Sequence, residues 1–558
     1  MNIETLGLMG VSSLMLTMLL MPVVMRLARA ANVIDLPDER KLHTNEIPSL
    51  GGFAIAVAFA VSCLLFLDID RLFIAFLTGL FIITLTGLAD DVWRIRPALK
   101  FAGEITGSLI FVLYGGTELK GFGDLIGIGP LETGIFAVPI TVFCMVGVMN
   151  AINFADGMDG LAGGMSAIAC LFLVYFSLQS GHWFDLALSV SLFGCLIGFL
   201  YFNSHPAKVF MGDTGSLVLG YILASLCVLS QKPDGGIPIA PVSMALILAL
   251  PIADTLWVMA NRVLRGESPF SPDNNHLHHK LMTLNLSHSG VVAVLYVCMF
   301  ICGFLAVFMQ SMLEWVQFAA GTGFIISLYV LVALFQRAGF KFPDHNMAHA
   351  VIKNSARGHN IVSNQTISRY LEKSVPIAAW LVPFSLIIPA FFISAGESNS
   401  GITTLLIGVI IMVLYPWKSN HKRLGWVHGL IYFATFTLLV FLNSSGLSWI
   451  NDYLKIVSSI LVVWVVMKLV FMQYSRIFLT SGFELLMIVT AWFIPLVLAR
   501  IMGMTDAGRQ MLIVSCLESI AFLFAMKIII HKEPSKNMVL VSCLACTYFL
   551  IGLGSLLK

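Results

Sequence analysis

The stretch LFIAFLTGLFIITLTGLADD, residues 72–91, decides the fold class. Its first 18 residues carry no charge, which is long enough for a helix to cross a bilayer, and it ends in two adjacent aspartates. Apolar runs that span or nearly span a bilayer recur before residue 336, at about 6–28, 51–67, 72–89, 99–114, 133–149, 161–178, 184–202, 215–229, 238–260, 291–309 and 315–335. These eleven runs predict an all-α protein, a polytopic transmembrane helical bundle.

The composition also indicates a membrane protein. Of 558 residues, 58% are hydrophobic and only 11% are charged, against roughly 25% charged in soluble proteins. The net charge of +2 is small and its carriers are scattered, so we expect no nucleic-acid partner. All ten cysteines lie in or beside apolar runs, which favours buried packing over disulfides or a zinc site.

A polar, basic stretch at 336–374 is the clearest interruption of the apolar pattern. About seven further apolar runs follow between Val375 and Lys558. We therefore predict three parts, namely a transmembrane core at 1–340, a basic cytoplasmic linker at 341–374 and an additional transmembrane domain of unknown role at 375–558.

Basic residues set the expected orientation, because lysine and arginine near span ends prefer the cytoplasm. They gather in the loops after odd-numbered spans, whereas the opposite loops before Val375 hold only Arg71, Lys120 and Lys232. The sequence thus predicts an outer amino terminus and cytoplasmic odd-numbered loops.

Polar residues that packing would not require occur in five clusters. They are DLPDERKLHTNEIPS at 35–49, the pair at 90–91, NAINFADGMDG at 150–160, NSHPAKVFMGDTGS at 203–216 and RVLRGESPFSPDNNHLHHK at 262–280. Every cluster falls in an inward loop or at its edge, so we expect all five to meet in one site at the cytoplasmic face.

Oxygen donors dominate the middle three clusters. The third cluster repeats them every three positions, at Asn150, Asn153, Asp156 and Asp159. Asp213 stands between two glycines, and the adjacent acids at 90–91 need a compensating cation or proton at a span end. Such donors suit a hard cation, Mg²⁺ or Mn²⁺, while helix caps and solvated helix ends are the alternative.

The last cluster combines three histidines, at 276, 278 and 279, with Arg262 and Arg265. Zinc is one interpretation, but no cysteine or fourth ligand accompanies the histidines. The arginines favour contacts with an anionic ligand such as a diphosphate.

These five ordered motifs resemble those of the polyprenyl-phosphate N-acetylhexosamine-1-phosphate transferases, over about the first 340 residues. The segment RGESPFSPDNNHLHH is similar to the sugar and diphosphate loop of the N-acetylglucosamine branch. The resemblance implies transfer of N-acetylglucosamine 1-phosphate, or a related N-acetylhexosamine 1-phosphate, from a UDP-N-acetylhexosamine to undecaprenyl (polyprenyl) phosphate. UMP would be released, and the product would initiate a lipid-linked cell-envelope polysaccharide. The resemblance also implies a multi-pass protein of the bacterial inner (cytoplasmic) membrane, with its active site facing the cytoplasm.

The resemblance also implies roles for individual residues. The catalytic residues would be Asp90, Asp91, Asp156 and Asp159, and the metal ligands would be Asn153 and Asp213. The substrate-binding residues would be Lys41, Ser49, Lys100, Asn203, Phe210, Arg265, His276, His278 and His279. Among these, Lys100 is expected at the lipid phosphate, and Asn203 with Phe210 at the uridine. Direct attack by the lipid phosphate and a covalent aspartyl route both stay open.

Other classes of protein also have many spans with ionisable residues, namely transporters and lipid-handling proteins. A transporter places coupling carboxylates near the bilayer midplane, whereas these acids gather at one surface. A non-catalytic scaffold would not need all five motifs. Membrane lipid is an expected partner, and the sequence leaves a homo-oligomer open.

Overall fold

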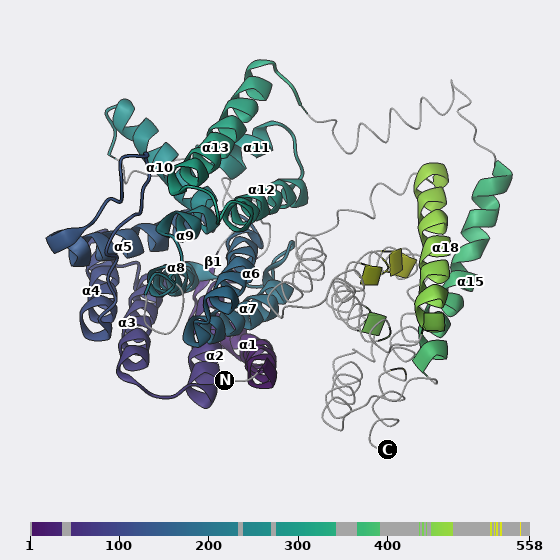
Figure 1. Cartoon of the computed structure of the whole chain (residues 1–558), viewed down its shortest axis with the longest axis horizontal. Helices are drawn as coiled ribbons and strands as arrows, with labels where there is room; N and C mark the ends of the chain where they lie inside the picture. The colour runs from purple at the N-terminus through teal and green to yellow at the C-terminus, as the bar shows by residue number, and fades with distance from the viewer. Residues whose placement is uncertain are drawn as a thin grey trace. The chain divides into compact units, whose positions relative to one another are not determined.

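The computed structural model describes residues 3–35, 46–232, 238–268, 275–341, 365–390 and 448–472, with a few single positions between 435 and 547. The chain divides into two compact units, of which the first contains Met1–Asp344 and the second most of the remaining residues (Figure 1). The border falls inside the predicted linker at 341–374, and the three-part division itself stays a prediction.

The first unit is built from helices. In the described part they are α1 (Ile3–Ala30), α2 (Gly51–Phe66), α3 (Arg71–Trp93), α4 (Pro97–Gly115), α5 (Ala137–Ala155), α6 (Leu161–Ser180), α7 (Trp183–Asn203), α8 (Gly212–Leu229), α9 (Pro241–Ile247), α10 (Ala249–Leu264), α11 (Leu277–Thr283), α12 (His288–Phe308) and α13 (Glu314–Arg337). A short 3-10 helix, η1 (Gly134–Phe136), precedes α5. Two short strands, β1 (Ile34–Asp35) and β2 (Ile47–Pro48), pair antiparallel.

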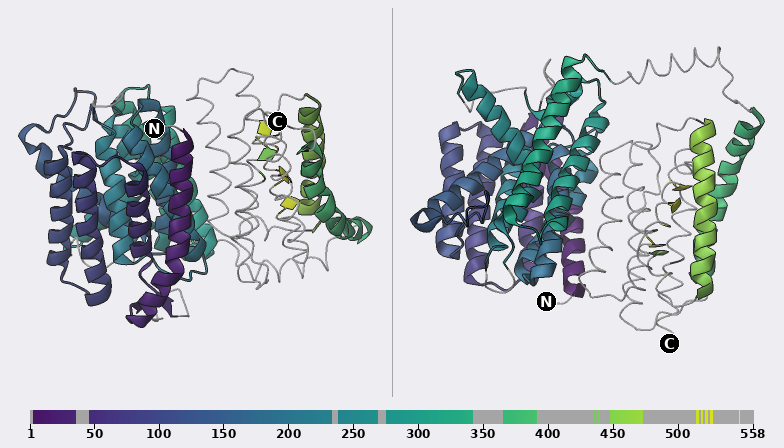
Figure 2. Two further views of the ribbon diagram at one scale, coloured as in Figure 1. Left: turned by 90° about the horizontal axis from the view of Figure 1, so that it is seen from below. Right: turned by 45° about the horizontal axis from the view of Figure 1, so that its top comes forward.

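Among the described residues, nine helices are long and apolar enough to cross a membrane, or ten if the bent pair α9 and α10 counts as one span. Together with the shorter α2 they account for all eleven predicted runs, so the polytopic helical bundle is confirmed. The long helices of this unit run roughly along one direction (Figure 2). The buried share of the apolar window is 89% in α6 and 83% in α8, which places these two helices at the centre of the bundle.

The apolar run at 238–260 predicts one continuous span, and the structure differs. Helix α9 ends at Ile247, and α10 starts at Ala249 with a bend of 78° between them. Pro251 gives the physical reason, because it has no N–H to donate to the carbonyl of Ile247 and its ring crowds that carbonyl. A proline is tolerated in the first turn of a helix, so one helix ends and a new one starts just before Pro251.

Close helix crossings fix the first turn of α8. A side chain at Gly52 in α2 would overlap the backbone of Gly215, and one at Gly87 in α3 would overlap the backbone of Thr214. Only glycine permits such an approach between backbones. Helices α2 and α3 therefore hold the start of α8, with Asp213, in one place.

Two helices of the second unit are described, α15 (Gln365–Ala390) and α18 (Ser448–Met472), and they pack on each other. The Trp464 indole N–H donates to the Ser374 hydroxyl at 2.8 Å. Helix α15 begins inside the predicted linker, nearer the amino terminus than the predicted start at Val375. The other predicted spans of this region lie outside the described residues.

Candidate active site

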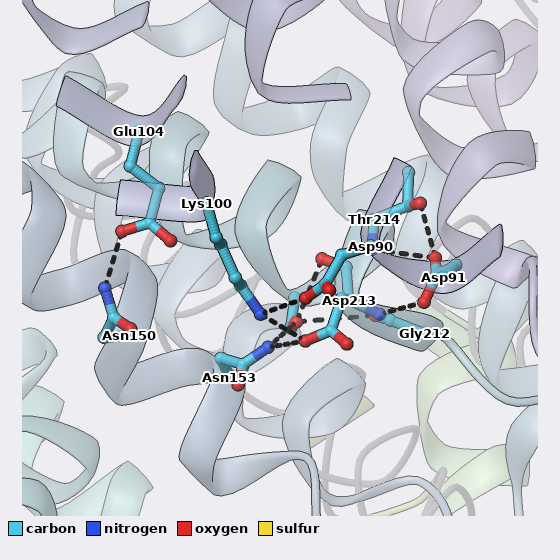
Figure 3. A network of polar contacts seen from close by, with 10 residues as sticks. Asp90, Asp91, Lys100, Glu104, Asn150, Asn153, Gly212, Asp213 and Thr214 are labelled. Atoms are coloured by element: carbon cyan, nitrogen blue, oxygen red, sulfur yellow. Dashed lines mark hydrogen bonds and ion pairs between the residues drawn. The ribbon is translucent and has the colours of Figure 1, made fainter. Parts of the chain in front are cut away.

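Four helix ends meet at one end of the bundle, and each carries a polar residue of the predicted site. Asp90 and Asp91 lie in the last turn of α3, Lys100 in the first turn of α4. Asn153 lies in the last turn of α5, and Asp213 in the first turn of α8. Residues from distant parts of the sequence therefore face one another, as Figure 3 shows.

The Lys100 ammonium lies between two carboxylates. Its Nζ is 2.6 Å from Asp213 Oδ1 and 3.0 Å from Asp90 Oδ2. The Asn153 side-chain N–H donates to the same Asp213 oxygen at 2.6 Å and to the Ser216 hydroxyl at 2.8 Å. The Asp213 side chain is 37% exposed and that of Asp90 only 14%, so Asp213 is the carboxylate that is more open to a ligand.

Asp91 has a different environment from its neighbour Asp90. Its carboxylate accepts the N–H of Asp213 at 2.7 Å, the N–H of Thr214 at 3.0 Å and the Thr214 hydroxyl at 2.5 Å. A carboxylate at the start of a helix satisfies its free N–H groups and is stabilised by the helix dipole. Asp91 therefore caps α8 from outside that helix and helps to place Asp213.

Asn150 and Asn153 do not share one partner, although their spacing puts both on one side of α5. The Asn150 amide donates to Glu104 Oε2 at 2.7 Å and to the Val146 carbonyl at 2.9 Å. Glu104 is buried one turn beyond Lys100 in α4. Asn150 therefore braces α4 against α5, while Asn153 joins the acidic cluster.

A cavity of about 560 Å³ opens beside this cluster. The predicted site residues that line it are Ser49, Asp91, Asn153, Asp156, Asp159, Asn203, Phe210, Asp213 and His279. Two histidines without a predicted role, His205 and His288, line it as well. The structure shows that these residues, from separate polar clusters of the sequence, line one pocket.

Acidic residues crowd the cavity and affect one another. Burial, followed by the charges of the carboxylates at 213, 91 and 159, raises the pKa of Asp156 to about 7. Burial also opposes ionisation of Asp159, but hydrogen bonds from His205 and from the Ala207 N–H outweigh it and hold the pKa of Asp159 below its usual value. The cavity therefore has an excess of negative charge that a cation would relieve.

Three predicted residues of the cavity wall, Ser49, Asn203 and Phe210, join separate loops through contacts with backbone groups. The Asn203 side chain accepts the Gly160 N–H at 2.9 Å and donates to the Val209 carbonyl at 2.9 Å, so it ties two loops together. The Phe210 N–H donates to the Pro48 carbonyl at 2.9 Å, and Ser49 and Phe210 form an isolated parallel bridge. These contacts fix the polar cluster at 35–49 to the cluster at 203–216.

The histidine cluster is anchored by an acid that the sequence reasoning missed. Asp254 of α10 accepts His276 Nδ1 at 2.8 Å and the Leu277 N–H at 2.9 Å. The Tyr329 hydroxyl of α13 donates to the same carboxylate at 2.5 Å. An acid inside an apolar run is itself a signal of function, and that rule could have found Asp254.

The remaining predicted residues lie around this anchor. The His276 ring stacks on Phe154 with centroids 5.7 Å apart, and His278 packs against Gly157. Burial, followed by the neighbouring His279, lowers the pKa of His278 to about 3. Arg265 is exposed at the end of α10, and Lys41 lies outside the described residues.

The donor set allows a test of whether Mg²⁺ fits. Carboxylate and amide oxygens from Asp90, Asn153 and Asp213 are the hard ligands that this ion prefers. The ammonium of Lys100 already lies between Asp90 and Asp213, so the position suits a cation. Mg²⁺ therefore fits these residues, and Mn²⁺ would use the same donors.

The fold and the sequence together define a membrane-bound glycosyl transferase. The chain belongs to glycosyl transferase family 4, which its residues 73–231 match. It is 34% identical over 306 residues to a probable undecaprenyl-phosphate N-acetylglucosaminyl 1-phosphate transferase of Bacillus subtilis (strain 168), covering 55% of this chain and 85% of the relative. The resemblance predicted from the motifs is confirmed.

Two other relatives carry related names. A decaprenyl-phosphate N-acetylglucosaminephosphotransferase of Mycolicibacterium smegmatis is 31% identical over 330 residues, covering 54% of this chain and 81% of the relative. An undecaprenyl-phosphate alpha-N-acetylglucosaminyl 1-phosphate transferase of Escherichia coli (strain K12) is 27% identical over 333 residues, covering 57% of this chain and 88% of the relative.

Proposed function

We propose that this protein transfers N-acetylglucosamine 1-phosphate from UDP-N-acetylglucosamine to undecaprenyl phosphate and releases UMP. The observation that carries the proposal is the meeting of Asp90, Lys100, Asn153 and Asp213 beside a cavity large enough for a nucleotide-sugar. The names of the relatives supply the substrate classes. A related N-acetylhexosamine stays an alternative donor, since one hydroxyl contact can switch preference.

Asn153 and Asp213 would hold Mg²⁺, with Asp90 next to them. The bound ion would offset the charge of the donor diphosphate and stabilise the charge that develops during transfer. The proposed donor position is the cavity lined by Asp156, Asp159 and Phe210.

The lipid phosphate would reach the site along Lys100, whose ammonium offsets the repulsion between two anionic substrates. An oxygen of that phosphate attacks the sugar-linked phosphorus of the donor, a new P–O bond forms, and the bond to UMP breaks. A phosphate monoester is largely ionised at neutral pH, so the attack needs no strong base. Asp90, whose Oδ2 is 3.0 Å from the Lys100 ammonium, would take any remaining proton.

The positions of the basic residues support a proposed place for the reaction. The site residues lie at helix ends, and the basic residues of the sequence gather in the loops of that end. Because such residues prefer the cytoplasm, the proposed orientation has the site facing the cytoplasm, in the bacterial inner membrane that the resemblance implies. The lipid product would then initiate a cell-envelope polysaccharide on the side where nucleotide-sugars are made.

The test is turnover by the purified full-length chain with undecaprenyl phosphate, Mg²⁺ and a panel of UDP-sugars. UMP release and the mass of the lipid product are measured, and a transporter or scaffold would give neither. We expect Asp213→Asn to lower UMP release at least about 100-fold, as loss of a preorganised charge contact does. Asp68→Asn, at an exposed acid in the loop between α2 and α3, is the matched control. Wild-type turnover in Asp213→Asn would contradict the assigned role.

A further inference from the structure

Three residues from three separate segments meet at one wall of the cavity. Asp159 lies in the loop between α5 and α6, His205 in the loop between α7 and α8, and His288 is the first residue of α12. Asp159 Oδ2 is 2.7 Å from His205 Nδ1, and the rings of His205 and His288 are stacked with centroids 4.2 Å apart. No motif of the sequence connects them.

A metal ion is the first interpretation of such a trio, since one ligand atom from each residue lies within 4.8 Å of the others. The ring geometry argues against it. A metal lies near the plane of each imidazole that binds it, in line with the nitrogen lone pair. The two ring planes here are only 21° from parallel and overlie each other, so their lone pairs cannot converge on one ion without a large rotation.

The contacts instead describe how one carboxylate is held. Asp159 Oδ2 accepts His205 Nδ1 at 2.7 Å and the Ala207 N–H at 3.1 Å. Both bonds fall on the same oxygen, and among the described residues Oδ1 receives none. Asp159 is therefore fixed in orientation while its second oxygen stays available to a ligand in the cavity.

His205 needs support of its own, because its side chain is 45% exposed. The stacked ring of His288 supplies that support. His288 is itself placed by the start of α12, where the Ser287 hydroxyl accepts the Gly290 N–H at 3.2 Å. The start of α12 thus places His288, His288 supports the His205 ring, and His205 holds Asp159.

We propose that His205, stacked on His288, is a positioning residue that holds Asp159 as a hydrogen-bond acceptor for the N–H or O–H groups of the nucleotide-sugar donor. The inference rests on the proposed function and assigns the two histidines to donor binding, not to the lipid phosphate or to the transfer step. His288 acts through the face of its ring, and His205 through its Nδ1–H.

The two roles predict different tolerance to substitution. His205→Ala removes a hydrogen bond to a charged acceptor and should raise KM for the UDP-sugar about tenfold or more, with little change in kcat or in KM for undecaprenyl phosphate. His205→Asn, whose amide N–H can take the place of Nδ1–H, should recover most of the loss. His288→Ala should also raise KM for the donor, and His288→Phe, which keeps a flat ring, should restore it to within a few-fold of wild type.

UDP binding by calorimetry gives a second readout that does not depend on turnover. His205→Ala should weaken it in proportion to the rise in KM. In the background of Asp159→Asn, His205→Ala should cause little further loss, because the two changes act on one interaction. Thermal midpoints in detergent show that each variant is folded.

The outcomes separate the inference from the proposed function. If wild-type protein releases no UMP, the proposed function fails. If it is active but His288→Phe is as impaired as His288→Ala, or Zn²⁺ binds at micromolar concentration and is lost in both His288 variants, then stacking is wrong and a metal site replaces it. A fall in kcat with unchanged donor KM and UDP affinity would also overturn the positioning role.

Discussion

At the scale of single residues, the ammonium of Lys100 decides the charge balance of the site. It is 2.6 Å from one Asp213 oxygen and 3.0 Å from Asp90, in a region where the lysine side chain is only 17% exposed. Carboxylates near the end of a membrane span are costly unless a cation lies close. The lysine therefore stabilises the acidic cluster and also offers the proposed lipid phosphate a positive partner.

The first prediction concerns this lysine. Lys100→Met keeps the length of the side chain and removes its charge, and we expect UMP release to fall at least about 100-fold at saturating Mg²⁺. Lys120→Met, at an exposed lysine in the loop after α4, should retain wild-type turnover. A Lys100→Met protein that is folded and within a few-fold of wild type would contradict the role.

The second prediction concerns pH and stability. The pKa of buried His278 is lowered to about 3 in the folded protein, whereas it is about 6.5 in an unfolded chain. The folded state thus needs the neutral ring. The contribution of His278 to the free energy of unfolding is therefore complete above about pH 6.5 and is lost as the pH falls toward 3. At pH 5.5 the loss is on the order of 1 kcal/mol.

His278→Gln removes the titration. The thermal midpoint of the wild type, measured in detergent, should therefore drop more between pH 7.5 and pH 5.5 than that of the variant. Equal drops in the two proteins would show that His278 is already charged in the folded state.

Sequence reasoning reached many of these residues and missed others for a clear reason. Asp90, Asn153 and Asp213 stand in motifs whose residue types point to phosphate and metal chemistry. His288 stands alone at the start of an apolar run, and its stacking on His205 arises only from the tertiary fold. The pairing of Lys100 with two acids of other helices is likewise invisible along the chain.

At the scale of elements, the crossing of α2 and α3 over the start of α8 decides where Asp213 lies. The backbones approach so closely that a side chain at Gly52 or Gly87 would overlap the backbone of α8, at Gly215 or Thr214 respectively. Because protein interiors are densely packed, such an overlap must move a helix.

The third prediction follows from this crossing. Gly52→Ala should displace the first turn of α8 and lower UMP release at least about tenfold, beyond a loss of stability of roughly 1–3 kcal/mol from overpacking. Gly147→Ala is the matched control, since that glycine lies in the span α5 and a side chain there would meet nothing within 4 Å. If both variants behave like wild type, the crossing does not position the site.

The elements themselves were well predicted from hydrophobic runs, with one exception. Each of the eleven runs contains a helix, because an apolar segment in a bilayer must satisfy its own backbone hydrogen bonds. The bend between α9 and α10 was not predicted from the apolar run at 238–260. Hydropathy carries no information about backbone hydrogen bonding, and Pro251 has no N–H to donate.

At the scale of the whole molecule, the proposed catalytic residues within the described part all lie in the first compact unit, Met1–Asp344. The family match at 73–231 also falls within it. The sequence could predict that a second group of spans exists, but no polar motif in it points to a function.

The fourth prediction is that a chain ending at Asp344 keeps transferase activity. All the described residues that line the cavity are retained in it, so UMP release per folded molecule should stay within about threefold of the full-length protein, a difference worth less than about 1 kcal/mol. Size-exclusion chromatography in detergent provides the folded fraction. Loss of turnover in a well-folded truncated chain would instead assign the second unit a part in the reaction.

The close pairing of Lys100 with Asp90 and Asp213 has a consequence for biogenesis. A newly inserted polypeptide carries its own counter-ion, so its acidic centre can assemble before the proposed Mg²⁺ binds. Under that proposal, starvation for magnesium should leave intact but inactive protein in the membrane, which regains activity when the ion returns.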